Sequence, residues 1–168
     1  MRVPFIARLP GRIPAATVRS GISCAIDLFT TLIELAGARI PDDRPIDGVN
    51  LWPMLSGVGE SPRDNLYYFS HNWESRPQLA ALRAGRWKLH FKQYWDWPQT
   101  KFEPTELYDL NGDPSESTDR AEDHPNIVAE LARRARTFHA GVEFGESPPV
   151  HYPPGAPERP YGGKRPVK

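Results

Sequence analysis

The first 65 residues combine an extended apolar segment, an amphipathic segment and a loop-rich stretch. Apolar side chains alternate over residues 3–9, which predicts a short, mostly buried strand that ends at a Pro-Gly pair. Residues 23–36 place most of their apolar side chains on one helical face, and Gly37 follows as a stop, so a helix is expected there. Residues 38–65 are punctuated by Pro, Asp and Gly and predict loops, with one short turn of helix over residues 51–55.

After residue 65 the apolar period becomes two, which indicates a sheet. Four strands are expected, over residues 66–69, 79–83, 87–92 and 106–110. The second and third are separated by Ala84-Gly85-Arg86, which is short enough to force an antiparallel hairpin. A helix is expected over residues 126–140, where the apolar period is close to 3.6. The second half is therefore predicted to be an α+β unit, in which a helix covers an antiparallel sheet.

The third predicted strand has two different faces. Trp87, Leu89 and Phe91 share one face and are expected to form the core under the final helix. The side chains between them point to the other face, which is expected to look outward: Lys88, His90 and Lys92.

Composition excludes several classes of protein. The 168 residues carry 21 basic and 21 acidic side chains, so no net field concentrates nucleic acid, and none is expected as a partner. A bilayer span needs about 20 apolar residues; no such segment occurs, and the N-terminal segment is too interrupted for a signal peptide. The single Cys24 excludes an internal disulfide and is expected to be a small buried hydrophobe. Seven of the 19 prolines lie within residues 147–168, which predicts an extended or disordered tail, with docking onto a partner as the alternative.

Motif spacing assigns no catalytic residue and no metal ligand. Asp109, Asn111 and Asp113 have the spacing that opens a calcium loop, but Pro114 and Arg120 stand where that loop needs Gly and Glu. A turn is the expected structure. The five histidines contain no pair at zinc-binding spacing, and neither a G-x-S-x-G motif nor a phosphate-binding glycine loop occurs. The other acidic cluster is expected to serve turns and caps: Asp42, Asp43 and Asp47.

Five local phrases occur in the order typical of the sulfatase family. They are Arg2-Val3-Pro4-Phe5-Ile6; Ile26-Asp27-Leu28-Phe29-Thr30-Thr31-Leu32; Asp47-Gly48 with Leu51 and Leu55; Arg86-Trp87-Lys88-Leu89-His90-Phe91; and Glu106-Leu107-Tyr108-Asp109-Leu110 with Asp113-Pro114-Ser115-Glu116. The chain therefore resembles the C-terminal portion of a sulfatase of arylsulfatase type, in the alkaline-phosphatase-like superfamily. Two positions depart from the family pattern, Thr30 where Pro is usual and Asp119 where Asn is common.

The resemblance implies a division of the chain into three parts. Residues 1–65 would be the C-terminal edge of a large α/β domain, and residues 66–146 a small four-stranded antiparallel sheet packed on a C-terminal helix. Residues 147–168 form the Pro/Gly-rich tail. The fold class is thus α/β to α+β, and the N-terminal catalytic portion of the family is the expected packing partner of the first part.

The resemblance also implies that the complete enzyme hydrolyses a sulfuric ester, in a small molecule or a glycan, and that this C-terminal fragment is inactive alone. Sulfatases use a formylglycine, made from Cys or Ser in a C/S-x-P/A-x-R motif, together with Ca²⁺. That motif does not occur in this sequence, and the metal-binding aspartates of the family precede the matched phrases. No catalytic residue, metal ligand or cofactor is therefore expected on this chain, and its native compartment stays open.

Two histidines are candidate substrate contacts in the manner of the family. His71 lies at the end of the first strand, and His90 lies beside two lysines on the outward face of the third, a pattern suited to an anionic ester. Surface packing for His71 and a solvated strand face for His90 are the alternatives. Two other functions also stay open: a phosphonate or phosphodiester hydrolase of the same superfamily, and a non-catalytic binding module that uses the Trp95/Trp97 loop and the tail.

Overall fold

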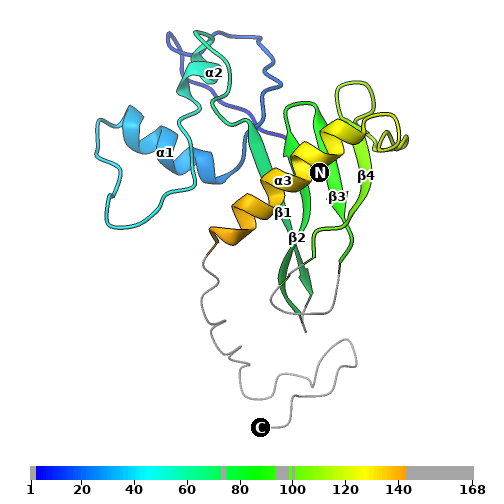
Figure 1. Cartoon of the computed structure of the whole chain (residues 1–168). Helices are drawn as coiled ribbons and strands as arrows, with labels where there is room; N and C mark the ends of the chain where they lie inside the picture. Colours follow the sequence, from blue (N-terminus) through cyan, green and yellow to red (C-terminus); the bar gives the residue numbers. More distant parts are fainter. Residues whose placement is uncertain (1–2, 73–74, 94–98, 100, 143–168) are drawn as a thin grey trace, which may run out of the picture.

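The computed structural model describes residues 3–72, 75–93, 99 and 101–142 of the chain. These residues form three helices and one sheet (Figure 1). The elements in chain order are α1 (Ile26–Leu35), α2 (Trp52–Ser56), β1 (Asn65–Asn72), β2 (Ser75–Ala84), β3 (Trp87–Phe91), β4 (Pro104–Asp109) and α3 (Pro125–Ala140). The predicted tail and the Trp95/Trp97 loop lie outside the described residues. None of the helices in the described part has the length and apolar character needed to cross a membrane.

The four strands form one antiparallel sheet in the order β1-β2-β3-β4. All four predicted strands and the predicted β2–β3 hairpin are confirmed. The hairpin turn contains Gly85 with a φ of 55°, a left-handed conformation that glycine adopts without a steric penalty. β1 and β2 are longer than expected, because their backbone pairing continues as far as Asn72 opposite Ser75, beyond the alternating side chains that mark a strand in the sequence.

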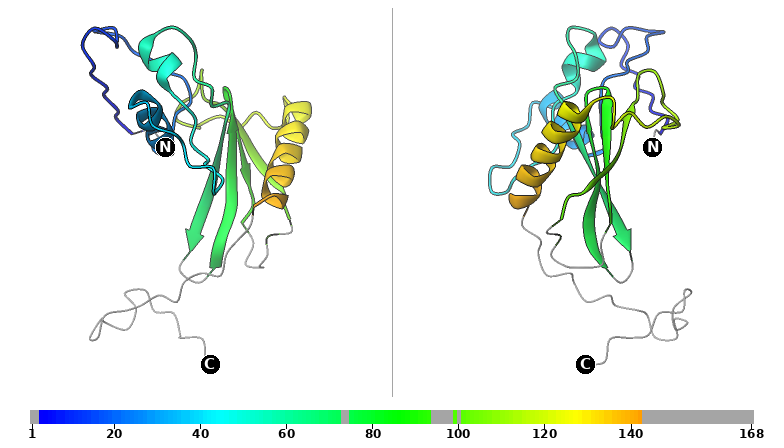
Figure 2. Two further views of the ribbon diagram at one scale, coloured as in Figure 1. Left: turned by 90° about the vertical axis from the view of Figure 1, so that its left-hand side faces the viewer. Right: turned by 45° about the vertical axis from the view of Figure 1, so that its right-hand side comes forward.

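The main hydrophobic core lies between α3 and one face of the sheet (Figure 2). Leu89 and Phe91 of β3 belong to this core, as predicted, and Trp87 packs against it. A register shift between β1 and β2 places Leu79 and Leu82 on the same face although they are three residues apart. The core residues are Leu79, Leu82, Leu89, Phe91 and Leu107 from the sheet and Leu131, Ala132 and Ala135 from α3.

The predicted strand over residues 3–9 is wrong. These residues adopt no regular structure, and Val3, Phe5 and Ile6 are 76%, 53% and 92% exposed. A segment becomes a strand only when a neighbouring strand satisfies its backbone N–H and C=O groups. No strand pairs with this segment in the described part of the chain, so its alternating pattern has no sheet to join.

Helix α1 is confirmed, although it covers residues 26–35 rather than 23–36, and Gly37 follows with a φ of 70°. Its buried side chains are polar: Asp27, Thr30 and Thr31. Its apolar face is open to solvent, with Ile26, Phe29 and Leu32 48%, 49% and 62% exposed. Among the described residues, this apolar face therefore stays accessible to a partner.

A buried carboxylate holds the segment before β1 together. Asp27 is fully buried and accepts hydrogen bonds from the backbone N–H groups of Cys24 (2.7 Å) and Val49 (3.0 Å). The Arg63 guanidinium donates to both of its oxygens through Nε (2.9 and 3.0 Å) and also to the carbonyl of Asp47 (2.7 Å). Burial alone raises the pKa of Asp27, but the Arg63, Val49 and Cys24 hydrogen bonds outweigh it and lower the pKa below its ordinary value.

Candidate functional site

A cluster of charged and aromatic side chains lies on the face of the sheet that α3 does not cover. β3 supplies two of them, because Lys88 and His90 alternate with the core residues of the strand. Lys88 stands opposite Tyr108 of β4, and His90 stands opposite Ala81 of β2, which in turn pairs with Tyr68 of β1. Three strands therefore contribute large polar or aromatic side chains to one patch.

The turn after β4 brings a carboxylate to this patch. Asp113 orders the turn, because its side chain accepts hydrogen bonds from the backbone N–H groups of Ser117 (2.7 Å) and Thr118 (2.8 Å) and from the Ser115 hydroxyl (2.8 Å). The Thr118 bond is the largest of the contributions that lower the pKa of Asp113 to about 2. Within the turn Glu116 adopts a left-handed conformation with a φ of 58°, which is uncommon outside glycine. The predicted turn is confirmed, and its geometry fixes the position of Glu116.

Glu116 contacts Lys88 and His90 of β3. Lys88 Nζ donates to both carboxylate oxygens at 2.7 Å, and His90 Nε2 lies 2.9 Å from Oε2. The three side chains are 9% (Lys88), 22% (Glu116) and 30% (His90) exposed. Partial burial raises the pKa of Glu116, but the hydrogen bonds from Lys88 and His90 outweigh it, so the pKa is lower than the ordinary value. Glu116 is thus held as a carboxylate between two donors.

Two tyrosines enclose this ionic cluster of Lys88, His90 and Glu116. Lys88 Nζ lies 5.1 Å from the ring centroid of Tyr68, within the range of a cation–π contact. The His90 ring packs edge-on against Tyr108 with centroids 5.5 Å apart. These contacts place Lys88 out of solvent, which corrects the expectation that the whole outward face of β3 is solvated. The physical reason is the turn after β4, which folds back over the face.

The two predicted substrate contacts lie at different places in the sheet. His90 belongs to the ionic cluster, where its Nε2 is hydrogen-bonded to Glu116 Oε2. His71 belongs to β1, and its side chain is not among those that the structure describes. Along β1 it lies three residues beyond Tyr68, the residue that is level with His90 across β2. Sequence reasoning missed Glu116 as a partner of His90, because no spacing rule connects residues 26 positions apart.

The described residues do not fit a calcium site. Among them no group of three or more His, Cys, Asp or Glu side chains converges on a point where a metal ion could sit. Asp109, from the calcium-like spacing, is paired with Arg86, and Asp113 is used by the turn. Cys24 is half-buried. The cluster of Lys88, His90 and Glu116 can orient side chains and interact with an anion, but it contains no nucleophile.

The chain is similar to sulfatases in sequence and in fold. Arylsulfatase A of Bos taurus is 31% identical, over 88% of this chain and 33% of the relative. N-acetylgalactosamine-6-sulfatase of Canis lupus familiaris is 34% identical, over 90% of this chain and 27% of the relative. A protein solved in complex with its substrate, D-glucosamine-2-N,6-O-disulfate, matches with a TM-score of 0.59 at 25% identity, over 79% of this chain and 27% of that chain. The sheet and helix are thus those of sulfatases with the alkaline-phosphatase-like fold.

Residues 1–140 match the family described as N-sulphoglucosamine sulphohydrolase, C-terminal. Because the match covers most of the chain, the chain belongs to this family. The resemblance to the C-terminal portion of arylsulfatase-type proteins is confirmed. The chain spans 33% and 27% of the length of the two curated relatives named above.

Proposed function

We propose that this chain forms the C-terminal part of an arylsulfatase-like sulfuric ester hydrolase and is inactive alone. The observation that carries the proposal is the family match over residues 1–140. The sequence contains no C/S-x-P/A-x-R motif, and its described residues gather no metal site. The formylglycine and the Ca²⁺ of the complete enzyme would therefore be held by the part of the relatives that this chain does not match.

A sulfated sugar or an aryl sulfate is the proposed substrate class of the complete enzyme. The relatives named above support it, since one is an N-acetylgalactosamine-6-sulfatase and the solved neighbour binds a disulfated glucosamine. His90 and His71 are proposed to contact the substrate. His90 supports this role because 30% of its side chain is exposed and Glu116 fixes its ring by holding one nitrogen.

The exposed apolar face of α1 supports a catalytic portion as the packing partner. The helix exposes Ile26, Phe29 and Leu32 to solvent, and the segment before it exposes Phe5 and Ile6. Apolar surfaces of this kind mark contacts with other protein. Relatives that are three to four times longer than the matched stretch contain enough chain to cover them.

Activity of the chain alone is the direct test of the proposal. The purified chain is incubated with an aryl sulfate and Ca²⁺, and hydrolysis is expected at the uncatalysed rate, because the sequence has no formylglycine motif and the described residues form no metal site. Saturable, calcium-dependent turnover would contradict the proposal. In a complete enzyme, His90→Ala is expected to lower kcat/KM without lowering the melting temperature. Unchanged kinetics would remove His90 from the substrate site.

The packing surface is tested by sedimentation of the isolated chain. Self-association that rises with concentration is expected, because the described residues leave the apolar face of α1 exposed. The double variant Phe29→Asp/Leu32→Asp should be monomeric. Val58→Asp is the matched control, because Val58 is 82% exposed but lies outside α1, and it should sediment like the unmodified chain. A monomeric unmodified chain would contradict the proposed packing.

A further inference from the structure

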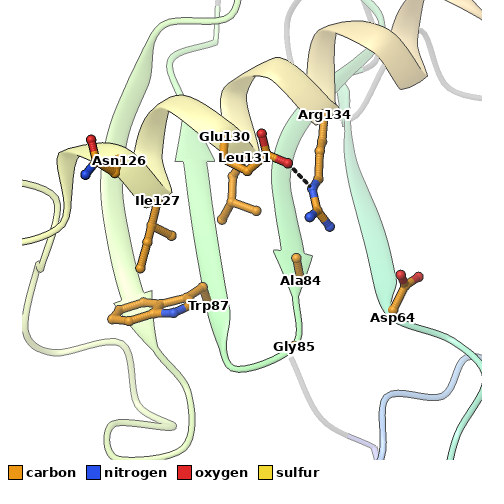
Figure 3. A pocket seen from close by; sticks show the side chains of 9 residues that line it. All are labelled: Asp64, Ala84, Gly85, Trp87, Asn126, Ile127, Glu130, Leu131 and Arg134. Carbon is orange, nitrogen blue, oxygen red and sulfur yellow. Dashed lines mark hydrogen bonds and ion pairs between the residues drawn. The ribbon is translucent and has the colours of Figure 1, made fainter.

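A pocket of about 400 Å³ opens between the first half of α3 and the turn from β2 to β3 (Figure 3). Ile127 and Leu131 point from the helix toward Trp87 and Ala84 on the sheet, and these apolar side chains form its interior. The volume lies in the range of sites for a short segment or a small molecule. The pocket is on the α3 side of the sheet, so it is separate from the Glu116 cluster on the opposite face.

The indole of Trp87 gives this pocket an aromatic floor. The ring is half-buried and held in place by the His124 ring, with centroids 4.7 Å apart, and by the Arg86 guanidinium 5.3 Å from its centroid. Aromatic-lined grooves are the recognition surface for proline-rich segments, which adopt the polyproline II conformation and lose little entropy on docking. The floor therefore favours a proline-rich occupant over a strongly polar one.

Asp64 at the edge of the pocket adds a preference for positive charge. The charged residues of the lining are Asp64, Glu130 and Arg134, and the charge of Glu130 is offset by arginines, so Asp64 is the carboxylate that a basic segment can meet. Asp64 is exposed, while Glu130 is bound by Arg133 and Arg134 at 2.9 and 2.8 Å. A basic segment that follows a proline-rich one would meet Asp64 at the open side.

The last residues of this chain have both properties. Pro154, Pro157 and Pro160 repeat the P-x-x-P spacing twice. From residue 157 onward one acidic residue is followed by four basic ones: Arg159, Lys164, Arg165 and Lys168. Trp87 complements the prolines, and Asp64 complements the basic residues.

The chain is long enough to make this contact. The pocket residues Ile127 and Leu131 lie 14 and 10 residues before Gly141 at the end of α3, which corresponds to about 15–21 Å along the helix. A polyproline II segment from residue 143 to Pro154 would span about 37 Å at 3.1 Å per residue. The segment from residue 143 to Pro154 is therefore longer than the distance to the pocket. The effective concentration of the proline-rich stretch at the pocket would be in the millimolar range.

We propose that this pocket is a docking site for the chain's own C-terminal tail, with the Pro154–Pro160 stretch against Trp87 and the basic residues near Asp64. The docking is independent of the sulfatase function proposed above. It would cover the half-buried side chains of Ile127 and Trp87, and it requires no second protein.

Nuclear magnetic resonance of the ¹⁵N-labelled full chain tests the proposal. Two variants are compared with the unmodified chain, Pro154→Ala/Pro157→Ala/Pro160→Ala and the matched control Pro148→Ala/Pro149→Ala/Pro153→Ala. Both change three tail prolines and leave every residue of the described fold intact. The indole N–H of Trp87 and the amides of Ile127 and Leu131 are expected to shift in the first variant and to stay in place in the control. Identical spectra for the first variant and the unmodified chain would overturn the proposal.

A second measurement identifies the occupant and its charge dependence. The dilution series uses the Phe29→Asp/Leu32→Asp background, which removes the self-association expected through α1. Shifts of Trp87, Ile127 and Leu131 that do not change on dilution support docking within one chain, whereas shifts that do change would assign the pocket to the tail of a second copy and overturn the proposal. Trypsin cleavage at Lys164 should be at least about threefold faster in Asp64→Lys than in the unmodified chain, since the acidic edge is reversed. Asp43→Lys, an exposed change away from the pocket, should leave the rate unchanged. Equal cleavage rates in both variants would overturn the role of Asp64.

Discussion

Replacing Leu89 with Ala measures how strongly the core face of β3 holds the fold. Leu89 is fully buried and stands opposite Leu82 on β2 and Leu107 on β4, both of which are also fully buried. The substitution removes about three methylene equivalents, worth roughly 0.8 kcal/mol each on transfer from water. The cavity that remains adds to this loss, so we expect a total of about 2–5 kcal/mol. Against a typical stability of about 5–15 kcal/mol, that is a large fraction.

His90→Ala is the matched control on the neighbouring residue of the same strand. Its side chain is 30% exposed on the opposite face, and Glu116 has a second partner in Lys88, whose Nζ lies 2.7 Å from Oε1. We expect a loss below roughly 1 kcal/mol, as for a partly exposed ion pair.

Urea denaturation followed by circular dichroism separates the two outcomes. A lower midpoint with an unchanged m-value reports a loss of stability without a change in the surface exposed on unfolding. A loss below about 1 kcal/mol for Leu89→Ala would mean that α3 does not seal this face. A larger loss for His90→Ala than for Leu89→Ala would refute the assignment of the two faces.

Three further predictions concern the buried and half-buried carboxylates. Glu116→Gln should cost about 1–3 kcal/mol in urea denaturation, because Lys88 loses its charged partner, and an unchanged midpoint would argue against this ion pair. The lowered pKa of Glu116 stabilises the fold above the ordinary value of 4.5, and this stability is lost as the pH falls through the lower folded pKa. The melting temperature should therefore drop more steeply below pH 4.5 in the unmodified chain than in Glu116→Gln, and parallel profiles would exclude this linkage. Asp27→Ala should destabilise the α1 region by about 3–5 kcal/mol, seen as faster amide exchange, because it leaves Arg63 buried without a counter-charge. The exposed Asp43→Ala should leave exchange unchanged.

The sheet could be predicted from the sequence because its signals are local. The turn between Ala84 and Trp87 is short enough to determine antiparallel pairing, and alternation within β3 assigns Leu89 and His90 to opposite faces. The prediction of a strand over residues 3–9 is wrong for a reason that the sequence does not show. Alternating side chains indicate that a segment could be a strand, but they do not show whether another strand is present to pair with it.

The ionic cluster could be predicted only in part. Lys88 and His90 were placed on one face by strand geometry, but their carboxylate comes from a turn whose left-handed residue is not glycine. That conformation depends on the side-chain hydrogen bonds of Asp113, which order the turn from within. The sequence signal that could have pointed to Glu116 was the Asp-Pro-Ser-Glu phrase, which carries the family resemblance without indicating what the Glu binds.

Helix α1 shows why an amphipathic pattern does not by itself say what lies against a helix. Its polar residues Asp27 and Thr31 are buried, because they bond the backbone of Val49 and Leu51, whereas Phe29 and Leu32 stand in solvent. These hydrogen bonds fix the polar side of the helix against the segment that contains Val49 and Leu51, and they leave the apolar side exposed. A partner that covers the apolar side would add hydrophobic contact to a helix that is already oriented, without first having to order it. The Asp27 network therefore orients the apolar side of the helix, and its loss should weaken the packing proposed above even though Asp27 lies on the opposite side of the helix.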